Sequence, residues 1–321
     1  MKAALLHKPG SIPKYEEVDD PIPENEDQVV LTVRAASLKN IDRSLAAGSH
    51  YDGHKKFPAI VGVDGVGILE DGTRVYSGGM SGMMAEKAIV AKKRCIALPD
   101  HIDDITAAAL PNPGMSAWLS LYYRAGIKPG ETVFVNGATG VTGKMAVQLA
   151  KYFGAKKVIA SGRNQQILET LPGLGADTLI SLAQPDADIA MAISDALHKD
   201  PFDIIIDYVW GHPAEMILQA LTGDDLFGEA HRTRYVSVGA MAGETIQLQS
   251  ATLRSSAVEI YGAGGGSLAP ETLRKIPELL LELMGLAASG KIKIETKVIA
   301  LKDIEAAWQQ TESGKRMVIV P

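Results

Sequence analysis

The chain has 321 residues, of which 46% are hydrophobic and 22% charged, and its formal net charge is -6. This length and composition predict two globular domains and exclude a large disordered fraction. The negative charge, with no basic run longer than Lys92-Lys93-Arg94, argues against a nucleic-acid or anionic-membrane partner, so we expect a small-molecule partner.

The chain has a single cysteine, Cys95, which excludes an intrachain disulfide and a cysteine-based zinc site. No apolar stretch has the length needed to span a bilayer. The apolar start of the chain stops at Pro9-Gly10, before it reaches the length of a secretion signal. We therefore expect a cytoplasmic location.

The chain up to about residue 113 consists of short β-rich segments broken by Gly, Pro and Asp. The predicted strands lie at 29–35, 62–69, 85–90 and 95–98. Sustained helical periodicity is absent from this part of the sequence. We therefore predict a compact β domain over residues 1–113.

From Glu131 onward, apolar strands alternate with helical segments, which is the pattern of βαβ units and a parallel sheet. The predicted strands lie at 131–136, 156–161, 178–181, 203–207, 234–239 and 258–263. Six strands is the number in a full doubly wound dinucleotide fold. An amphipathic helix is predicted at 142–153. We predict an α/β protein whose second domain, residues 114–263, holds this sheet.

The last part of the chain, residues 264–321, begins with a glycine cluster at 264–266, which suits a hinge, and no longer follows the alternating strand and helix pattern. A helical stretch interrupted by Pro277 follows, and then strands at 291–301 and 315–320 around a short helix at 303–310. These strands have no parallel-sheet partner. We expect them to return to the first domain and complete it.

A glycine-rich loop joins the first strand of the parallel sheet to its helix. It consists of Gly137, Ala138, Thr139, Gly140, Val141, Thr142 and Gly143. Glycines permit a tight turn and close approach of the backbone to a pyrophosphate, and the helix N-terminus offers free N–H groups. The spacing alone is weak evidence, but its place between a strand and an amphipathic helix favours nucleotide binding over a plain structural turn.

The end of the next strand selects the cofactor. It carries Ser161, Gly162, Arg163 and Asn164, and it lacks the acid that an NAD site places on the ribose 2′-hydroxyl. A carboxylate here would repel a 2′-phosphate, whereas Arg163 can bind it with a charge-assisted, bidentate contact. We therefore predict NADP(H) as the cofactor. The alternative is that Arg163 is an ordinary surface charge.

Motifs along nearly the whole chain resemble the medium-chain dehydrogenase/reductase family. The matching segments are 36–42, 48–51, 57–67, 107–111, the glycine-rich loop, Leu174-Gly175-Ala176-Asp177 and 304–308. The resemblance implies a GroES-like β domain beside a Rossmann domain, with the β domain completed by the C-terminal segment. Together these motifs are more specific than the loop alone.

The departures from the family pattern concern zinc. Zinc-dependent members carry a cysteine, a histidine and a cysteine at the positions that Lys39, Val63 and Asn112 occupy here. The four-cysteine zinc lobe is also missing, because residues 69–75 contain no cysteine. We expect no bound metal and a resemblance to the quinone oxidoreductase branch.

The resemblance implies hydride transfer from NADPH to a small-molecule electron acceptor, a quinone or an α,β-unsaturated carbonyl. The protein must then hold the reactants in position and offer a donor to the oxygen that becomes negative. The candidate catalytic residues are Tyr51, Lys39 and Asn40. A packing tyrosine and an exposed surface lysine are the alternatives. Asp42 is expected to cap or brace the segment that follows it.

The nicotinamide is expected in the crevice outside the carboxyl ends of the strands. The candidate residues there are Tyr208, Val238, Gly239, Gly262 and Ala263. As the resemblance implies, the edge strand at 258–263 can pair with its copy in a homodimer.

Two other functions remain open at this point. One is a reductase acting on carbonyls or enoyl thioesters. The other is a non-catalytic NADPH-binding redox sensor. Turnover with an acceptor distinguishes an enzyme from a sensor.

Overall fold

The computed structural model describes residues 1–48, 54, 56–223 and 230–321. The chain divides into two compact units. The terminal unit comprises Met1–Pro111 and Pro277–Pro321, and the central unit comprises Asn112–Ile276.

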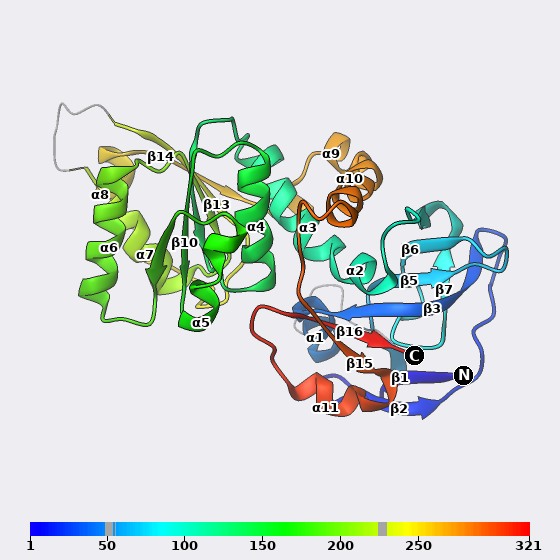
Figure 1. Ribbon diagram of the computed structural model, residues 1–321. Helices are drawn as coiled ribbons and strands as arrows, with labels where there is room; N and C mark the ends of the chain where they lie inside the picture. The colour runs from blue at the N-terminus through cyan, green and yellow to red at the C-terminus, as the bar shows by residue number, and fades with distance from the viewer. Residues whose placement is uncertain (49–53, 55, 224–229) are drawn as a thin grey trace. The chain divides into compact units, whose positions relative to one another are not determined.

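The terminal unit is built on two sheets of mainly short strands (Figure 1). Its strands are β1 (Lys2–Leu6), β2 (Lys14–Glu17), β3 (Gln28–Leu38), β4 (Ala59–Ile60), β5 (Asp64–Ile68), β6 (Arg74–Gly78), β7 (Lys87–Ala91), β8 (Ile96–Ala97), β15 (Thr296–Ala300) and β16 (Arg316–Val320). Its helices are α1 (Asn40–Ala47), α2 (Asp104–Ala109), α10 (Ile276–Ala288) and α11 (Ile304–Gln309), with short 3-10 turns at Lys92–Arg94 and Leu301–Asp303. One sheet has the order β2-β1-β4, and the other has the order β15-β16-β3-β5-β6-β8, with β7 also on β3.

Strand β3 holds the terminal unit together. Its long alternating segment places Leu31 and Val33 in a core with Leu6 of β1 and Met83. The C-terminal strand β16 pairs antiparallel with β3, with Val318 opposite Ser37. The chain therefore returns at its C-terminal end to the sheet that contains β3.

The central unit contains one six-stranded parallel sheet. Its strands are β9 (Thr132–Asn136), β10 (Lys157–Gly162), β11 (Thr178–Ser181), β12 (Ile204–Asp207), β13 (Arg232–Ser237) and β14 (Ala257–Gly262). The spatial order β11-β10-β9-β12-β13-β14 is that of the doubly wound dinucleotide fold. The predicted α/β fold class is confirmed.

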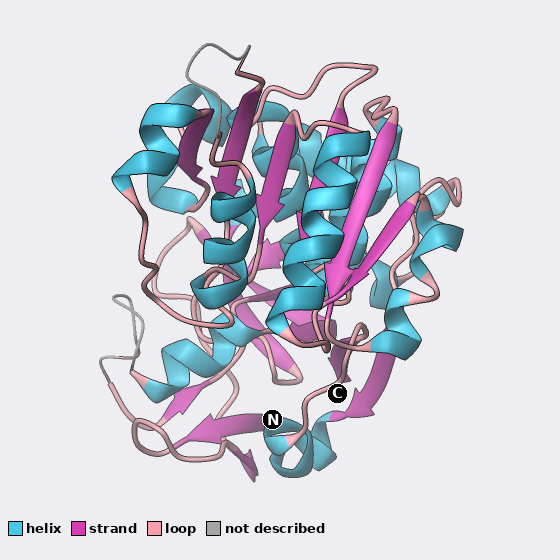
Figure 2. Ribbon diagram, turned by 90° about the vertical axis from the view of Figure 1, so that its left-hand side faces the viewer, coloured by secondary structure: helices cyan, strands magenta, loops and turns pink. Residues whose placement is uncertain are grey.

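Helices cover both faces of this sheet (Figures 1 and 2). The helices of the central unit are α3 (Pro111–Trp118), α4 (Val141–Tyr152), α5 (Gln165–Leu168), α6 (Asp186–Lys199), α7 (Gly211–Ala220), α8 (Ser250–Ser255) and α9 (Pro270–Arg274), with a π-helical turn at Leu119–Arg124 and 3-10 turns at Leu171–Leu174 and Gly265–Ser267. Alternate residues of a strand point to opposite faces. Phe134 packs in a core with Ile193 of α6 and Ile217 of α7, so Val133 and Val135 face α4 on the other side.

Within these ranges, every helix is too short or too polar to cross a membrane.

Candidate functional site

The glycine-rich loop of the central unit makes a tight turn at Gly137, where φ is +84°. This left-handed conformation favours glycine. A Cβ at Gly137 would also lie 2.6 Å from Cγ2 of Val209. The N–H groups of Gly137 and Ala138 donate to the Ser161 carbonyl oxygen at 3.1 and 2.7 Å, which ties the loop to β10.

The other two loop glycines have different roles. A Cβ at Gly143 would collide with the Gly137 carbonyl oxygen and lie 2.6 Å from the Ala138 Cα, so only glycine lets α4 begin this close to the loop. At Gly140, φ is -77° and a Cβ would lie 3.6 Å from the Gly137 carbonyl oxygen, an ordinary contact. The chain itself therefore has room for a side chain at 140, and glycine leaves that space open beside the helix N-terminus.

The first turn of α4 presents unused backbone donors. The first intrahelical bond runs from the Lys144 N–H to the Gly140 carbonyl oxygen at 2.9 Å, and no side chain caps the helix at Gly140. The N–H groups of Val141, Thr142 and Gly143 therefore lack intrahelical acceptors. Together with the helix dipole they form a site suited to a phosphate.

Arg163 follows β10 directly and is exposed. Among the residues whose placement is known, none forms a hydrogen bond or ion pair with its guanidinium. A Cβ at the neighbouring Gly162 would lie 2.8 Å from Oγ1 of Thr139, so Thr139 of the loop packs on the residue before Arg163. Arg163 therefore follows directly after a residue that contacts the glycine-rich loop.

Ser161 and Asn164 are engaged within the protein. The Ser161 hydroxyl is buried and donates to Oδ1 of Asn136 at 2.7 Å. Oδ1 of Asn164 accepts the Ile167 N–H at 3.1 Å and caps α5. Of the four residues predicted around the 2′-phosphate, Arg163 is therefore the one with a charged group directed to solvent.

The predicted nicotinamide-side residues follow β12, β13 and β14. The N–H groups of Val238 and Gly239 donate to the Asp207 carbonyl oxygen at 2.8 and 3.2 Å, and a Cβ at Gly239 would lie 2.9 Å from the Tyr208 carbonyl oxygen. Burial raises the pKa of the Tyr208 phenol, which therefore stays protonated. The structure brings Tyr208, Val238 and Gly239 together at the carboxyl end of the sheet.

Gly262 and Ala263 close the next strand of that sheet. The Ala263 N–H donates to the Ser237 carbonyl oxygen at 2.8 Å, which ties this end of β14 to β13. The Gly262 carbonyl oxygen accepts from Nε of Arg124 at 2.8 Å. Both residues therefore also lie at the carboxyl end of the parallel strands.

In the terminal unit, Lys39 is buried, with 2% of its side chain exposed. Its ammonium group donates to Oδ1 of Asp64 at 2.8 Å and to the carbonyl and hydroxyl oxygens of Ser37 at 3.1 and 3.2 Å. Asp42 Oδ2 lies 3.7 Å from the same nitrogen. An ammonium has three donors. Lys39 is therefore an internal cation with its donors occupied, in contrast to the exposed surface lysine of the alternative interpretation.

Asp42 braces the start of α1. Its carboxylate accepts the Lys39 N–H at 2.7 Å and the Val63 N–H at 2.8 Å, which confirms the expected capping role. Burial raises the pKa of Asp42, and the nearby Lys39 opposes that shift. Asn40 is the exposed first residue of α1. Tyr51 lies outside the described residues.

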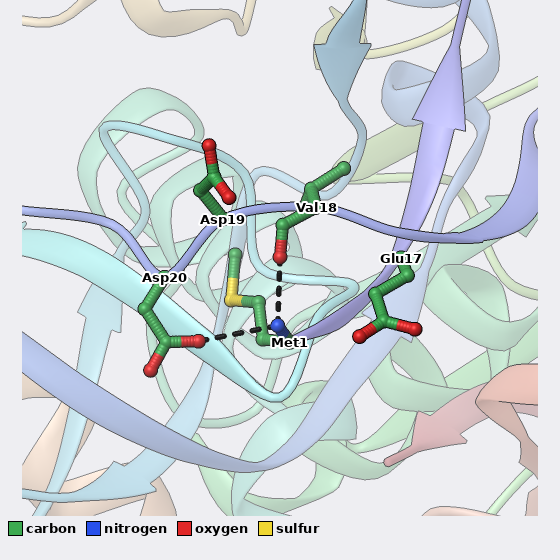
Figure 3. Close-up of a pocket in the computed structure, with 5 residues that line it drawn as sticks. All are labelled: Met1, Glu17, Val18, Asp19 and Asp20. Carbon is green, nitrogen blue, oxygen red and sulfur yellow. Dashed lines mark hydrogen bonds and ion pairs between the residues drawn. The ribbon is translucent and has the colours of Figure 1, made fainter.

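No group of three or more His, Cys, Asp or Glu side chains in the described ranges is placed to hold a metal ion. A hollow in the terminal unit is lined by Met1, Glu17, Val18, Asp19 and Asp20 (Figure 3). There the Met1 amine donates to the Val18 carbonyl oxygen at 2.7 Å and pairs with Asp20 at 3.2 Å. Because its acidic side chains outnumber its one amine, this hollow does not suit an anionic dinucleotide.

Three comparisons with known proteins bear on this geometry. Residues 141–282 match the family model described as zinc-binding dehydrogenase. The whole chain aligns with the whole of a probable NADPH-dependent quinone reductase, tdiC, of Emericella nidulans, with 30% identity over 365 aligned positions. The chain belongs to the medium-chain dehydrogenase/reductase family. It is an oxidoreductase of the quinone oxidoreductase-like branch of this family, as the sequence motifs predicted.

Two further relatives show the range of this family. A trans-enoyl reductase, pgmF, of Aspergillus terreus is 29% identical over 169 residues, which are 53% of this chain and 44% of that protein. The crystal structure of Escherichia coli quinone oxidoreductase complexed with NADPH matches all of both chains, with a TM-score of 0.84 and 21% identity. At this identity, the structural match establishes the medium-chain fold.

Sequence reasoning missed one group of residues at the site, Asp207 with Asn136 and Tyr235. Oδ1 of Asp207 accepts from Nδ2 of Asn136 at 2.8 Å, and Oδ2 accepts from the Tyr235 hydroxyl at 2.6 Å. The sequence does mark these positions, because Asn136 and Asp207 each follow three consecutive apolar residues at the end of a strand. Polar residues at such strand ends lie at the edge where α/β proteins bind ligands.

Proposed function

We propose that the chain is an NADPH-dependent, metal-independent reductase that transfers hydride to a quinone or an α,β-unsaturated carbonyl. The observation that carries this proposal is the uncapped first turn of α4, together with the exposed, unengaged guanidinium of Arg163 at the end of the adjacent strand β10. These groups match the two anionic parts of NADPH, the pyrophosphate and the 2′-phosphate.

The residues present fit this cofactor. The N–H groups of Val141, Thr142 and Gly143 would hold the pyrophosphate, and Arg163 would hold the 2′-phosphate. When bound, the cofactor would supply the hydride. The Emericella nidulans relative is described as NADPH-dependent, and the Escherichia coli enzyme was crystallised with NADPH, which supports NADPH as this cofactor.

For the acceptor oxygen, Tyr51, Lys39 and Asn40 remain our proposed groups. A direct contact between Lys39 and the acceptor would require its ammonium to give up Ser37 or Asp64. If Lys39 keeps these contacts, it instead fixes the start of α1, where Asn40 is the exposed first residue. Either role lets the protein place donors before the reaction, which is the main catalytic requirement here.

The test of this function is NADPH oxidation by the purified chain with a panel of acceptors. We expect turnover with quinones or enones and slower or no turnover with simple ketones, because conjugation spreads the developing charge without a metal. The panel should include enoyl thioesters, because the trans-enoyl reductase among the relatives favours that second candidate. Cofactor binding without turnover on any acceptor would support the sensor and reject the enzyme.

We also propose a homodimer formed through β14. This strand ends the sheet order, and within the described chain only β13 pairs with it. Its Ile260 side chain is 37% exposed, and an uncovered edge strand favours pairing with another strand. Light scattering should give about twice the chain mass of 34.1 kDa. A monomer mass at every concentration would reject the dimer.

A further inference from the structure

Four polar side chains form a buried chain of hydrogen bonds at the carboxyl end of the central sheet. Ser161, Asn136 and Asp207 lie opposite one another on three adjacent strands. The Ser161 hydroxyl donates to Asn136 at 2.7 Å, the Asn136 amide donates to Asp207 at 2.8 Å, and the Tyr235 hydroxyl donates to Asp207 from the other side at 2.6 Å. All four side chains are completely buried. Asn136 and Tyr235 donate directly to the Asp207 carboxylate, and Ser161 fixes the Asn136 amide by donating to its oxygen.

The same carboxylate holds the segment that follows β12. Oδ1 of Asp207 accepts the Val209 N–H at 2.8 Å and the Trp210 N–H at 3.1 Å, while Oδ2 lies 3.2 Å from the Trp210 nitrogen. The main-chain oxygen of Asp207 accepts from Val238 and Gly239. Within the described residues Asp207 forms no ion pair, so backbone and side-chain donors stabilise this buried anion.

Trp210, in this segment, has an unfavourable backbone conformation. Its φ of 53° with ψ of -158° lies in a region that residues other than glycine rarely adopt. The Trp210 N–H is fixed by Asp207, and its ring packs edge-on against Tyr235 with centroids 6.1 Å apart. Such conformations persist where the surroundings determine them strongly, and they concentrate at functional sites.

The held segment lies at the carboxyl end of the parallel sheet, the edge where α/β folds bind ligands. Cγ2 of Val209 lies 2.6 Å from the place of a Cβ on Gly137, and the Tyr208 carbonyl oxygen limits the space at Gly239. The segment therefore lies between the glycine-rich loop and the end of β13. Arg163, by contrast, follows β10 on the other side of β9.

We propose that Asp207 is a positioning residue for the nicotinamide half of the cofactor. Its carboxylate fixes residues 208–210 between the loop and β13, whereas the adenosine half depends on Arg163. This inference rests on the proposed function, because it assumes that the crevice binds NADPH.

The experiment compares two ligands by titration calorimetry. NADPH has both halves, while adenosine 2′,5′-bisphosphate keeps the 2′-phosphate and lacks the nicotinamide half. Asp207→Asn removes the charge and replaces one accepting oxygen with an NH2 group, which donates and cannot accept a hydrogen bond. We expect this variant to weaken NADPH binding about tenfold, because the segment that faces the nicotinamide half loses hydrogen bonds to a charged group. The affinity for adenosine 2′,5′-bisphosphate should change less than about twofold, because this ligand lacks the nicotinamide half.

A matched control lies at the other end of the same strand. Asp203 precedes β12 and accepts the Thr132 N–H at 2.7 Å, so Asp203→Asn makes the same chemical change away from the crevice. It should leave both affinities unchanged. Arg163→Ala should weaken both ligands.

The outcomes separate the inference from the function on which it rests. Equal losses of both ligands in Asp207→Asn, or no loss of either, would overturn the positioning role. If Asp207→Asn does not fold, Tyr235→Phe carries the test, with a selective loss of about threefold expected for NADPH because one of the donors is removed. A folded Tyr235→Phe without this loss overturns the role. A wild-type chain that binds neither ligand refutes the proposed function itself.

Discussion

Arg163→Ala is expected to weaken NADPH binding about a hundredfold, or about 2.7 kcal/mol, and to leave NADH binding nearly unchanged. The guanidinium is exposed, follows β10 directly and has no partner among the described residues. It can therefore bind a 2′-phosphate without first breaking an internal ion pair. NADH has a hydroxyl at that position, so the lost interaction is specific to NADPH. Calorimetric titration of both cofactors measures the difference.

Arg254 provides a matched control for this substitution. It is an exposed arginine on α8 of the same unit, so Arg254→Ala removes the same charge at a different place. We expect both affinities to stay unchanged, because α8 packs on β14, at the other end of the sheet order from β10 and Arg163. If Arg163→Ala weakens NADPH and NADH equally, Arg163 does not select the cofactor. If Arg254→Ala gives the same selective loss, net charge is responsible.

The sequence predicted the central strands β9, β10 and β12 well because they are almost entirely buried. Strands buried on both faces are nearly continuous apolar runs, and polar residues or glycines mark their ends. The prediction of 178–181 coincides with β11, and the predicted helix 142–153 differs from α4 by one residue at each end. In the terminal unit, the short strands β1, β2, β4 and β6 were missed. Strand β4 has two residues, too few for any alternation to show.

The partners of the buried polar groups could not be predicted from local sequence patterns. Lys39 depends on Asp64, which lies 25 residues along the chain, and Asp207 depends on Tyr235, which lies 28 residues away. An isolated lysine in a sequence favours the surface, because burying its charge is costly without a partner. Whether a partner is present depends on strand pairing and tertiary packing. The glycine-rich loop was predictable because its donors come from the local backbone.

Lys39→Met is expected to lower the free energy of unfolding by about 3 kcal/mol, because it leaves buried carboxylates without their cation. Methionine keeps the length and apolar volume of the side chain but cannot contact Asp64 or Asp42. This value is at the lower end of the usual range for breaking a buried pair. The reason is that Arg316 and Arg43 also attract the Asp42 carboxylate electrostatically, so it keeps part of its compensation when Lys39 is removed. Denaturant unfolding at constant m-value measures the loss.

The loss of stability in Lys39→Met should be larger at neutral than at acidic pH. Burial raises the pKa of Asp42, and Lys39 is the largest influence that lowers it again. Without Lys39 the pKa of folded Asp42 rises further above its unfolded value, so the folded variant binds the proton more readily than the unfolded chain. Stability tied to such a group is lost as the pH rises through its folded pKa. The deficit of Lys39→Met should therefore be larger at about pH 7.5 than at about pH 5.

Lys87→Met is the control that separates a buried pair from a surface pair. Lys87 forms an ion pair with Asp20, and both side chains are substantially exposed. Exposed pairs contribute about 0 to 1 kcal/mol, so this variant should be nearly as stable as the wild type at both pH values. Equal losses of unfolding free energy in the two variants would show that the buried Lys39 pair contributes no more to stability than an exposed pair. A deficit in Lys39→Met that grows on acidification would mean that Asp42 is not the carboxylate that Lys39 neutralises.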